Sequence, residues 1–259
     1  MVLLENITWP KAREQILKCD VAMVPIGSTE QHGLHLPMGT DHFLARFISR
    51  EVTNRTGILC TPTIPIGISD HHIQFWGTLT VTPDTLRQYM IETCLSLKTH
   101  GIHKIIIYNC HGGNQLAMEE AARILRTEHR LPTFVCHVVA ASLASYVNEL
   151  FGHEGAYAGA HCGGAETSLI MAMHEDLVDK VELAKGTRGA EKYGKQVFGT
   201  PVAFDVIDFS SNGMIGIPAE GTKERGMKLL NRTIEEMCNF VEWVKKTPLD
   251  EMLPKPHIE

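Results

Sequence analysis

Four short apolar segments, separated by longer amphipathic stretches, constrain the fold of this chain more than any other feature. The clearest is Lys104–Tyr108, in which three consecutive isoleucines precede a tyrosine. A strand that is apolar at odd and even positions alike buries both faces, as strands of covered parallel sheets do. Residues 21–26, 58–63 and 133–139 have the same character. The pattern predicts a mainly parallel sheet with helices on both faces.

Helical patterns fill the gaps between these segments. Thr82 followed by Pro83 is typical of the start of a helix, and Gly101 is typical of its end. Further helices are predicted at residues 114–125, with Asn114 as the cap, at 166–173 and at 223–245.

The order of these elements is β-α-β-α-β, which predicts an open α/β sheet with right-handed crossovers. The chain shows no repeat or linker, so we expect a single domain over residues 1–259. Residues 185–215 are richer in Gly, Ser and Lys, and we interpret them as an ordered excursion or an oligomer contact.

Composition excludes several classes of protein. The net charge is −6 and no run of Lys or Arg stands out, so nucleic-acid binding is not expected. No window approaches the ~18 apolar residues of a membrane span, and the first residues do not resemble a signal peptide. The seven cysteines have no paired spacing, which is typical of reduced thiols in the cytoplasm.

The 14 histidines are unusual, and several lie beside carboxylates. Glu30 and His32 follow the first predicted strand, and their spacing of two directs both side chains to one side of an extended loop. Asp41 begins the next helix, where the helix dipole favours its ionised form. A Glu, a His and an Asp suit zinc, manganese or iron better than calcium. The alternative for this segment alone is a polar loop with capping carboxylates.

Two later segments add to this group. His111 follows the predicted strand 104–108 and precedes two glycines, which allow close approach to an ion or a substrate. His161 and Glu166 flank another glycine pair at a helix start. The alternatives are an ordinary strand-to-helix turn around His111 and a capping box at Glu166. In an open α/β sheet, ligands bind at the carboxyl ends of strands, where these residues are expected.

Together these motifs resemble the creatininase family. The resemblance rests on Glu30-Gln-His32-Gly with Asp41, Asn109-x-His111-Gly-Gly-Asn114 and His161-x-Gly-Gly-x-Glu166-Thr-Ser168, supported by His72-x-x-Phe75-x-Gly77-Thr78 and residues 211–218. It implies a three-layer α/β/α fold with a mostly parallel sheet, a centre of one or two divalent ions (zinc, manganese or iron) and a homo-oligomer, commonly a hexamer.

The resemblance also implies roles for these residues. Glu30, Asp41 and His111 would hold one metal ion. His32 would hold the second, with Asp41 bridging the two ions. His161 and Glu166 would lie beside the substrate as catalytic residues.

The chain departs from creatininase proper at two places. The second metal ion there takes a glutamate two residues after the histidine equivalent to His111, and Gly113 stands at that position. Glu166 or water would have to complete the site. Tyr157 stands where creatininase has one of the tryptophans that close over creatinine, so creatinine is not the expected substrate. Tyr157 and His72 are candidate substrate contacts, although His72 in its loop is equally consistent with a solvated polar group.

These observations predict a hydrolase that uses a metal-activated water on a small-molecule substrate, either a cyclic amide or a formamide. Alternatives are hydrolysis of an oxidised cyclitol or of a peptide with the same metals. A non-catalytic metal-binding descendant is disfavoured because His161 and Glu166 accompany all four metal ligands. Whether Glu166 orients His161, accepts a proton or binds metal stays open at the level of sequence.

Overall fold

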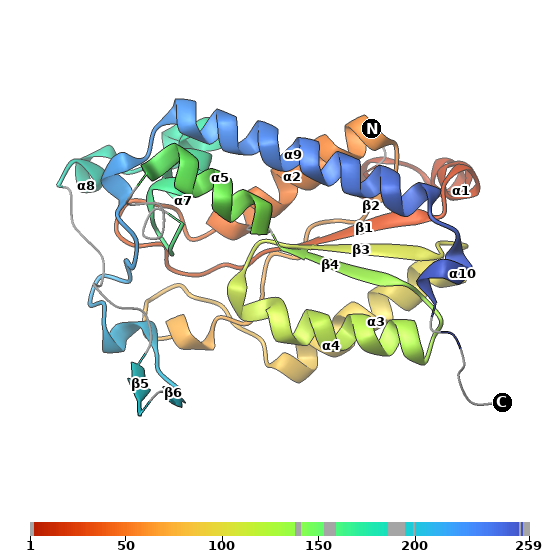
Figure 1. Ribbon diagram of the computed structural model, residues 1–259, viewed down its shortest axis with the longest axis horizontal. Helices are drawn as coiled ribbons and strands as arrows, with labels where there is room; N and C mark the ends of the chain where they lie inside the picture. Colours follow the sequence, from red (N-terminus) through yellow and green to blue (C-terminus); the bar gives the residue numbers. More distant parts are fainter. Residues whose placement is uncertain are drawn as a thin grey trace.

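The computed structural model describes residues 3–137, 141–152, 159–185, 195–198, 200–253 and 255. Its central sheet has four parallel strands in the order β2-β1-β3-β4, and helices cover both faces (Figure 1). The strands are β1 (Val21–Ile26), β2 (Leu59–Cys60), β3 (Lys104–Asn109) and β4 (Thr133–His137), with a separate antiparallel hairpin of β5 (Lys195–Val197) and β6 (Thr200–Val202).

Helices make up the two outer layers. The α-helices are α1 (Trp9–Lys18), α2 (Thr40–Thr56), α3 (Pro83–Thr99), α4 (Gln115–Thr127), α5 (Ala141–Phe151), α7 (Gly164–His174), α8 (Lys180–Ala184), α9 (Lys223–Lys246) and α10 (Leu249–Met252). The 3-10 helices are η1 (Leu4–Asn6), η2 (Asp70–His72), η3 (Gly112–Asn114), η5 (Glu175–Leu177), η6 (Val206–Asp208) and η7 (Pro218–Glu220).

The isoleucine-rich strand β3 shows why the sheet is covered on both sides. Ile105 and Ile107 pack into one apolar core with α3 and α4. Ile106 and Tyr108 point the other way into a second core with α2, α7 and α9. Figure 1 shows the sheet between these two helical layers. The expected three-layer α/β fold with a parallel sheet is confirmed.

Two predicted features, a strand length and a helix cap, differ from the structure. The predicted strand 58–63 has only two ladder residues, because the pairing with β1 shifts register: the Thr61 N–H donates to the Met23 carbonyl, but the next donor, to the Pro25 carbonyl, is the N–H of Ile64. Residues 138 and 139 of the predicted fourth strand lie outside the described residues. Asn114 precedes α4 as expected but does not cap it. Its side chain instead bonds to the Ile68 N–H and the Gly27 carbonyl, and so joins the loops after β1 and β2.

Two further observations concern the surface of the molecule. Met227, in the first turns of α9, is 45% exposed. Within the described part of the chain, no helix combines the length and apolar character that crossing a membrane requires.

Candidate metal centre

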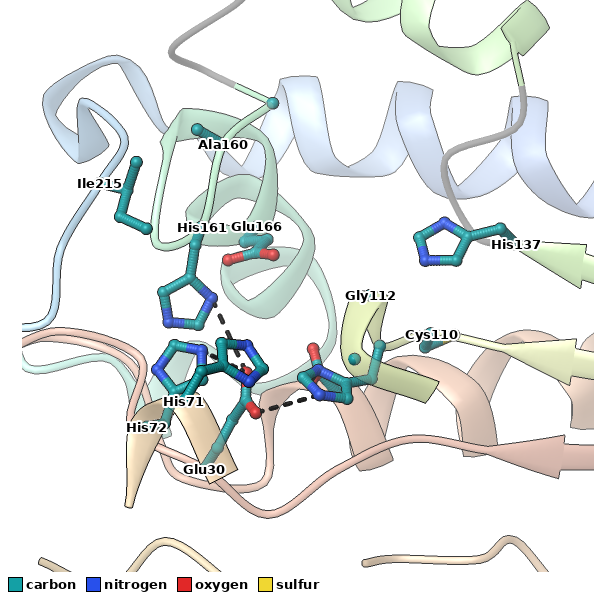
Figure 2. A pocket seen from close by; sticks show the side chains of 14 residues that line it. Glu30, His71, His72, Cys110, Gly112, His137, Ala160, His161, Glu166 and Ile215 are labelled. Atoms are coloured by element: carbon teal, nitrogen blue, oxygen red, sulfur yellow. Dashed lines mark ion pairs between the residues drawn. The ribbon is translucent and has the colours of Figure 1, made fainter. Parts of the chain in front are cut away.

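A cavity of about 300 Å³ opens at the carboxyl edge of the sheet. Its walls come from the segments after β1 and β3, from the last residue of β4, from η2 and from the entry to α7, so distant parts of the sequence meet there (Figure 2). The lining residues are Glu30, Asp41, His71, His72, Cys110, His111, Gly112, Gly113, His137, Gly159, Ala160, His161, Glu166 and Ile215.

Glu30, Asp41 and His111 form the most deeply buried group in the cavity. Glu30 follows β1, Asp41 lies in the first turn of α2, and His111 follows β3. The His111 ring lies between the two carboxylates, with Nε2 at 3.3 Å from Glu30 Oε2 and Nδ1 at 3.0 Å from Asp41 Oδ2. Each residue offers a ligand atom within 4.8 Å of the others.

Hydrogen bonds to main-chain carbonyls determine which ring nitrogens are free. His111 Nε2 donates to the Ile68 carbonyl at 2.8 Å, and His32 Nδ1 donates to the Glu30 carbonyl at 3.1 Å. Since a carbonyl only accepts, these two nitrogens carry the hydrogens. In the neutral form of each ring, the nitrogens without a hydrogen are therefore His111 Nδ1 and His32 Nε2, and these are called the bare nitrogens below.

These two bare nitrogens face the two oxygens of Asp41. His111 Nδ1 approaches Oδ2 at 3.0 Å, and His32 Nε2 approaches Oδ1 at 3.2 Å. Neither His32 Nε2 nor Asp41 Oδ2 has a hydrogen-bond partner, although both atoms are fully buried. Buried polar atoms are normally paired, so these donor atoms fit a bridging carboxylate between two cations.

Without a cation, the buried carboxylates act on the histidines. Burial by itself lowers the pKa of His32, but Asp41 and, less strongly, Glu166 and Glu30 raise it to about 10. Burial also opposes the charge of His111, yet Glu30 and Asp41 raise its pKa well above the usual value. The centre therefore carries excess negative charge, which either protons or metal ions neutralise.

A second group consists of His32, His161 and Glu166, whose ligand atoms also lie within 4.8 Å of one another. Glu166 Oε2 is 3.9 Å from His32 Nε2 and accepts the Cys162 N–H at 2.7 Å. The capping box considered from sequence is not formed, because the N-cap residue is Gly163 and Glu166 accepts from the N–H of the residue before it. Burial raises the pKa of Glu166 to about 7.

Gly113 contributes no ligand, and the backbone leaves no room for one. A Cβ at this position would lie 2.1 Å from the Ile68 carbonyl oxygen and 2.6 Å from His111 Nε2. Both distances are shorter than any van der Waals contact. A carboxylate at position 113 is therefore incompatible with this backbone, and Glu166 is the carboxylate that lies near His32 in addition to Asp41.

His72 and His161 line the other side of Glu30. His72 Nε2 is 3.5 Å and His161 Nδ1 is 3.8 Å from Glu30 Oε1. Burial lowers the pKa of His72 to about 4, and burial together with His32 lowers that of His161 well below the usual value. Both rings are thus neutral, and His72 is buried rather than solvated. Tyr157 lies outside the described residues.

Cys110 and His137 are cavity residues to which the sequence assigned no role. Cys110 adjoins His111, and His137 is the last residue of β4. His71, in the same loop as His72, stacks near His111 with ring centroids 5.9 Å apart. His137 could have been predicted as a cavity residue, because it lies near the carboxyl end of a predicted parallel strand, where ligands bind.

The sequence of this chain is similar to known proteins over most of its length. Residues 5–241 match the family model described as "Creatininase: Creatinine amidohydrolase". The chain belongs to the creatininase family. As members of this family and the relatives below are amidohydrolases or peptidases, the chain is a hydrolase, and both the recognition and the enzyme prediction are confirmed.

The relatives include more than one activity. The chain is 30% identical over 228 residues to the mycofactocin precursor peptide peptidase of Mycolicibacterium smegmatis, covering 85% of this chain and 81% of that one. It is 27% identical over 192 residues to the creatinine amidohydrolase of Pseudomonas putida, covering 69% and 74%. This agrees with a family member other than creatininase proper.

A solved structure from the same family has a similar fold. The crystal structure of creatinine amidohydrolase (creatininase) superposes with a TM-score of 0.82 at 23% identity, covering 95% of this chain and 99% of that one.

Proposed function

We propose that this protein hydrolyses an amide C–N bond with the help of two divalent metal ions that share Asp41. One observation carries the proposal: each carboxylate oxygen of Asp41 faces a ring nitrogen of a different histidine, Oδ1 that of His32 and Oδ2 that of His111. Solved creatininases with this fold include a Zn-Zn type mutant and a manganese form. The mixed nitrogen and oxygen donors suit zinc, manganese or iron.

The ligands divide between the two ions. Glu30, Asp41 and His111 would hold the first ion. His32, Asp41 and Glu166 would hold the second, since Glu166 is near His32 and position 113 cannot carry a carboxylate.

When bound, divalent ions lower the pKa of water and polarise the carbonyl of an amide. His161 is neutral and lies beside both ion sites, with its Nδ1 toward Glu30. A neutral imidazole in this place accepts the proton of the attacking water and returns it to the leaving nitrogen. His72 lines the cavity as a substrate contact and supports Glu30.

The cavity also bears on the substrate. About 300 Å³ accommodates a small molecule or one end of a peptide. Among the described lining residues there is no lysine or arginine, so a phosphate group would lack a cationic partner in that part of the chain. We therefore favour an uncharged cyclic amide or a formamide without phosphate.

A peptide bond is the second candidate. It is favoured by similarity to the mycobacterial peptidase over 85% of this chain. A cyclitol has less support, because the 3-dehydro-scyllo-inosose hydrolase of Thermotoga maritima matches over 114 residues, 36% of its length.

The test combines elemental analysis with a substrate screen. Protein prepared without chelator is assayed on lactams, formamides, short peptides and cyclic diketones, before and after removal of metal. We expect turnover of an amide that stops on chelation and returns with zinc or manganese. Amide turnover that persists in metal-free protein, or turnover confined to the diketones, contradicts the proposal.

We further propose one domain over residues 1–259 that assembles as a cytoplasmic homo-oligomer, a hexamer by analogy with the family. Trp76 and Phe198 are 97% and 104% exposed, and a subunit interface that covered them would bury their apolar side chains. Light scattering after gel filtration measures the assembly, and a monomer would contradict it.

A further inference from the structure

Gln31 lies between the candidate ligands Glu30 and His32 in sequence, and its side chain is almost fully buried, with 5% of the residue exposed. The amide nitrogen, Nε2, lies within hydrogen-bonding distance of three groups. These are His72 Nδ1 at 2.7 Å, His161 Nε2 at 2.9 Å and the Gly213 carbonyl at 3.1 Å. One amide thus touches both histidines that flank Glu30.

The orientation of this amide follows from a neighbour that only donates. The Gly33 N–H points at Gln31 Oε1, 2.8 Å away. An oxygen must occupy that position, so the nitrogen faces the histidines. Gly213, at a φ of +77°, approaches the same amide so closely that a Cβ there would lie 1.9 Å from Oε1. The site is built around this one arrangement.

The amide nitrogen has two hydrogens for three neighbours. The Gly213 carbonyl only accepts and takes one hydrogen. His161 Nε2 also lies 2.9 Å from the main-chain carbonyl of Gln31, which only accepts, so this ring nitrogen carries a hydrogen of its own. The second amide hydrogen therefore goes to His72 Nδ1.

We propose that Gln31 is a positioning residue that holds His72 and His161 in fixed and opposite roles toward the centre. His72 accepts at Nδ1 and so presents Nε2–H to Glu30 Oε1, 3.5 Å away. His161 donates at Nε2 to the main-chain carbonyl of Gln31 and so presents a bare Nδ1 on the side of Glu30. Figure 2 shows both rings directed at Glu30.

The two roles have different consequences. A ring that presents N–H orients the Glu30 carboxylate and is unsuited to bind metal at that nitrogen. A ring that presents a lone pair accepts a proton. This inference rests on the proposed hydrolytic function for its catalytic meaning, but the hydrogen positions are measurable without any substrate.

The test is ¹⁵N NMR of the histidine rings in the zinc-loaded protein, with His72→Asn and His161→Asn to assign the signals. We expect wild-type His72 and His161 both to be protonated at Nε2 only. Gln31→Glu removes both amide donors, so His72 should gain a hydrogen at Nδ1 while His161 keeps its Nε2 hydrogen. Gln31→Met, of similar length, should leave His72 as a mixture of tautomers. The control Gln88→Glu, on the exposed face of α3, should change neither ring.

Kinetics on the best amide substrate gives the second measurement. Gln31→Met should lower kcat on the order of 10²-fold, as small misplacements of catalytic groups do, with metal content and KM close to wild type. A wild-type His161 protonated at Nδ1, or His72 signals unchanged in both Gln31 variants, overturns the inference. If the protein shows the expected tautomers but hydrolyses no amide, the inference about Gln31 stands and the proposed function is wrong.

Discussion

The two halves of the candidate centre are built from different parts of the fold. The ligand side chains of Glu30, Asp41 and His111 are 1–5% exposed and follow directly from β1, β3 and the first turn of α2. His161 and Glu166 belong to the entry of α7, and their side chains are 16% and 23% exposed. The first half is held by the core of the sheet, whereas the second half depends on one helix start. We expect the first half to bind metal more tightly.

Replacing Asp41 should break both halves at once and give the largest effect. Asp41→Ala removes the carboxylate that faces both bare histidine nitrogens, so both ions should be lost. Activity should fall by at least about 10³-fold, the scale of several kcal/mol supplied by bound ions. Elemental analysis and a turnover assay on the same preparation measure the two losses.

Asp84→Ala is the matched control, since Asp84 is also an acidic first-turn residue but is exposed on α3. It should change neither metal content nor activity. If Asp41→Ala still bound two ions, Asp41 would not be the ligand that the two ions share.

His161→Ala separates chemistry from metal binding in the second half. Because His161 is assigned proton transfer, kcat should fall on the order of 10²-fold or more. Metal content and Tm should stay close to wild type, as they should in the control His100→Ala on the surface. Normal turnover per folded, metal-loaded molecule would show that His161 serves only the packing of its loop.

Glu166→Gln should convert a two-ion centre into a one-ion centre. An amide oxygen is a weaker ligand than a carboxylate, so the ion at His32 should be lost. The ion held by Glu30, Asp41 and His111 should remain bound. Titration of the metal-free protein should show two unequal affinities in wild type and one in the variant. Glu224→Gln, in the first turn of α9, is the control. Two equally tight sites in Glu166→Gln would contradict the ligand assignment.

The smallest effect concerns pH. With a pKa of about 10, His32 holds a proton at neutral pH in the metal-free protein, and an incoming ion must displace it. Since protons compete with the ion, affinity should fall as pH falls, about tenfold per pH unit for each proton displaced. Below about pH 7 the fall should steepen, because Glu166 then also takes up a proton.

Calorimetry in two buffers of different protonation enthalpy counts the protons released on binding. Below pH 7 the metal affinity of the wild type should fall more steeply because Glu166 takes up a proton. In Glu166→Gln the affinity should fall with the same slope above and below pH 7. An affinity that stays constant between pH 6 and 8 would mean that His32 is already neutral.

The sheet and the residues that line the cavity were predictable from the sequence for a physical reason. Apolar residues on both faces of Lys104–Tyr108 require helices on both sides, and parallel strands bring their carboxyl ends to one edge. Glu30, Asp41 and His111 follow or face those ends, so their meeting was predictable. His161 and Glu166 came from their motif, supported by the family resemblance.

The contacts that orient these residues were not predictable in the same way. Gln31 meets His72 across 41 residues of sequence and Gly213 across 182. Asn114 was expected at a helix cap, yet it spans to Ile68 and Gly27. Such contacts depend on how loops pack, and neither residue type nor local spacing specifies that packing.

The crowding around Gly113 bears on how this protein and creatininase diverged. A single codon change that places glutamate at position 113 would push against the Ile68 carbonyl and the ring of His111, so the first ion site would be damaged before the second gained a ligand. An evolutionary path that brings a carboxylate to position 113 therefore requires the Ile68 carbonyl to move first. The same order of steps applies to any laboratory attempt to graft creatinine hydrolysis onto this chain.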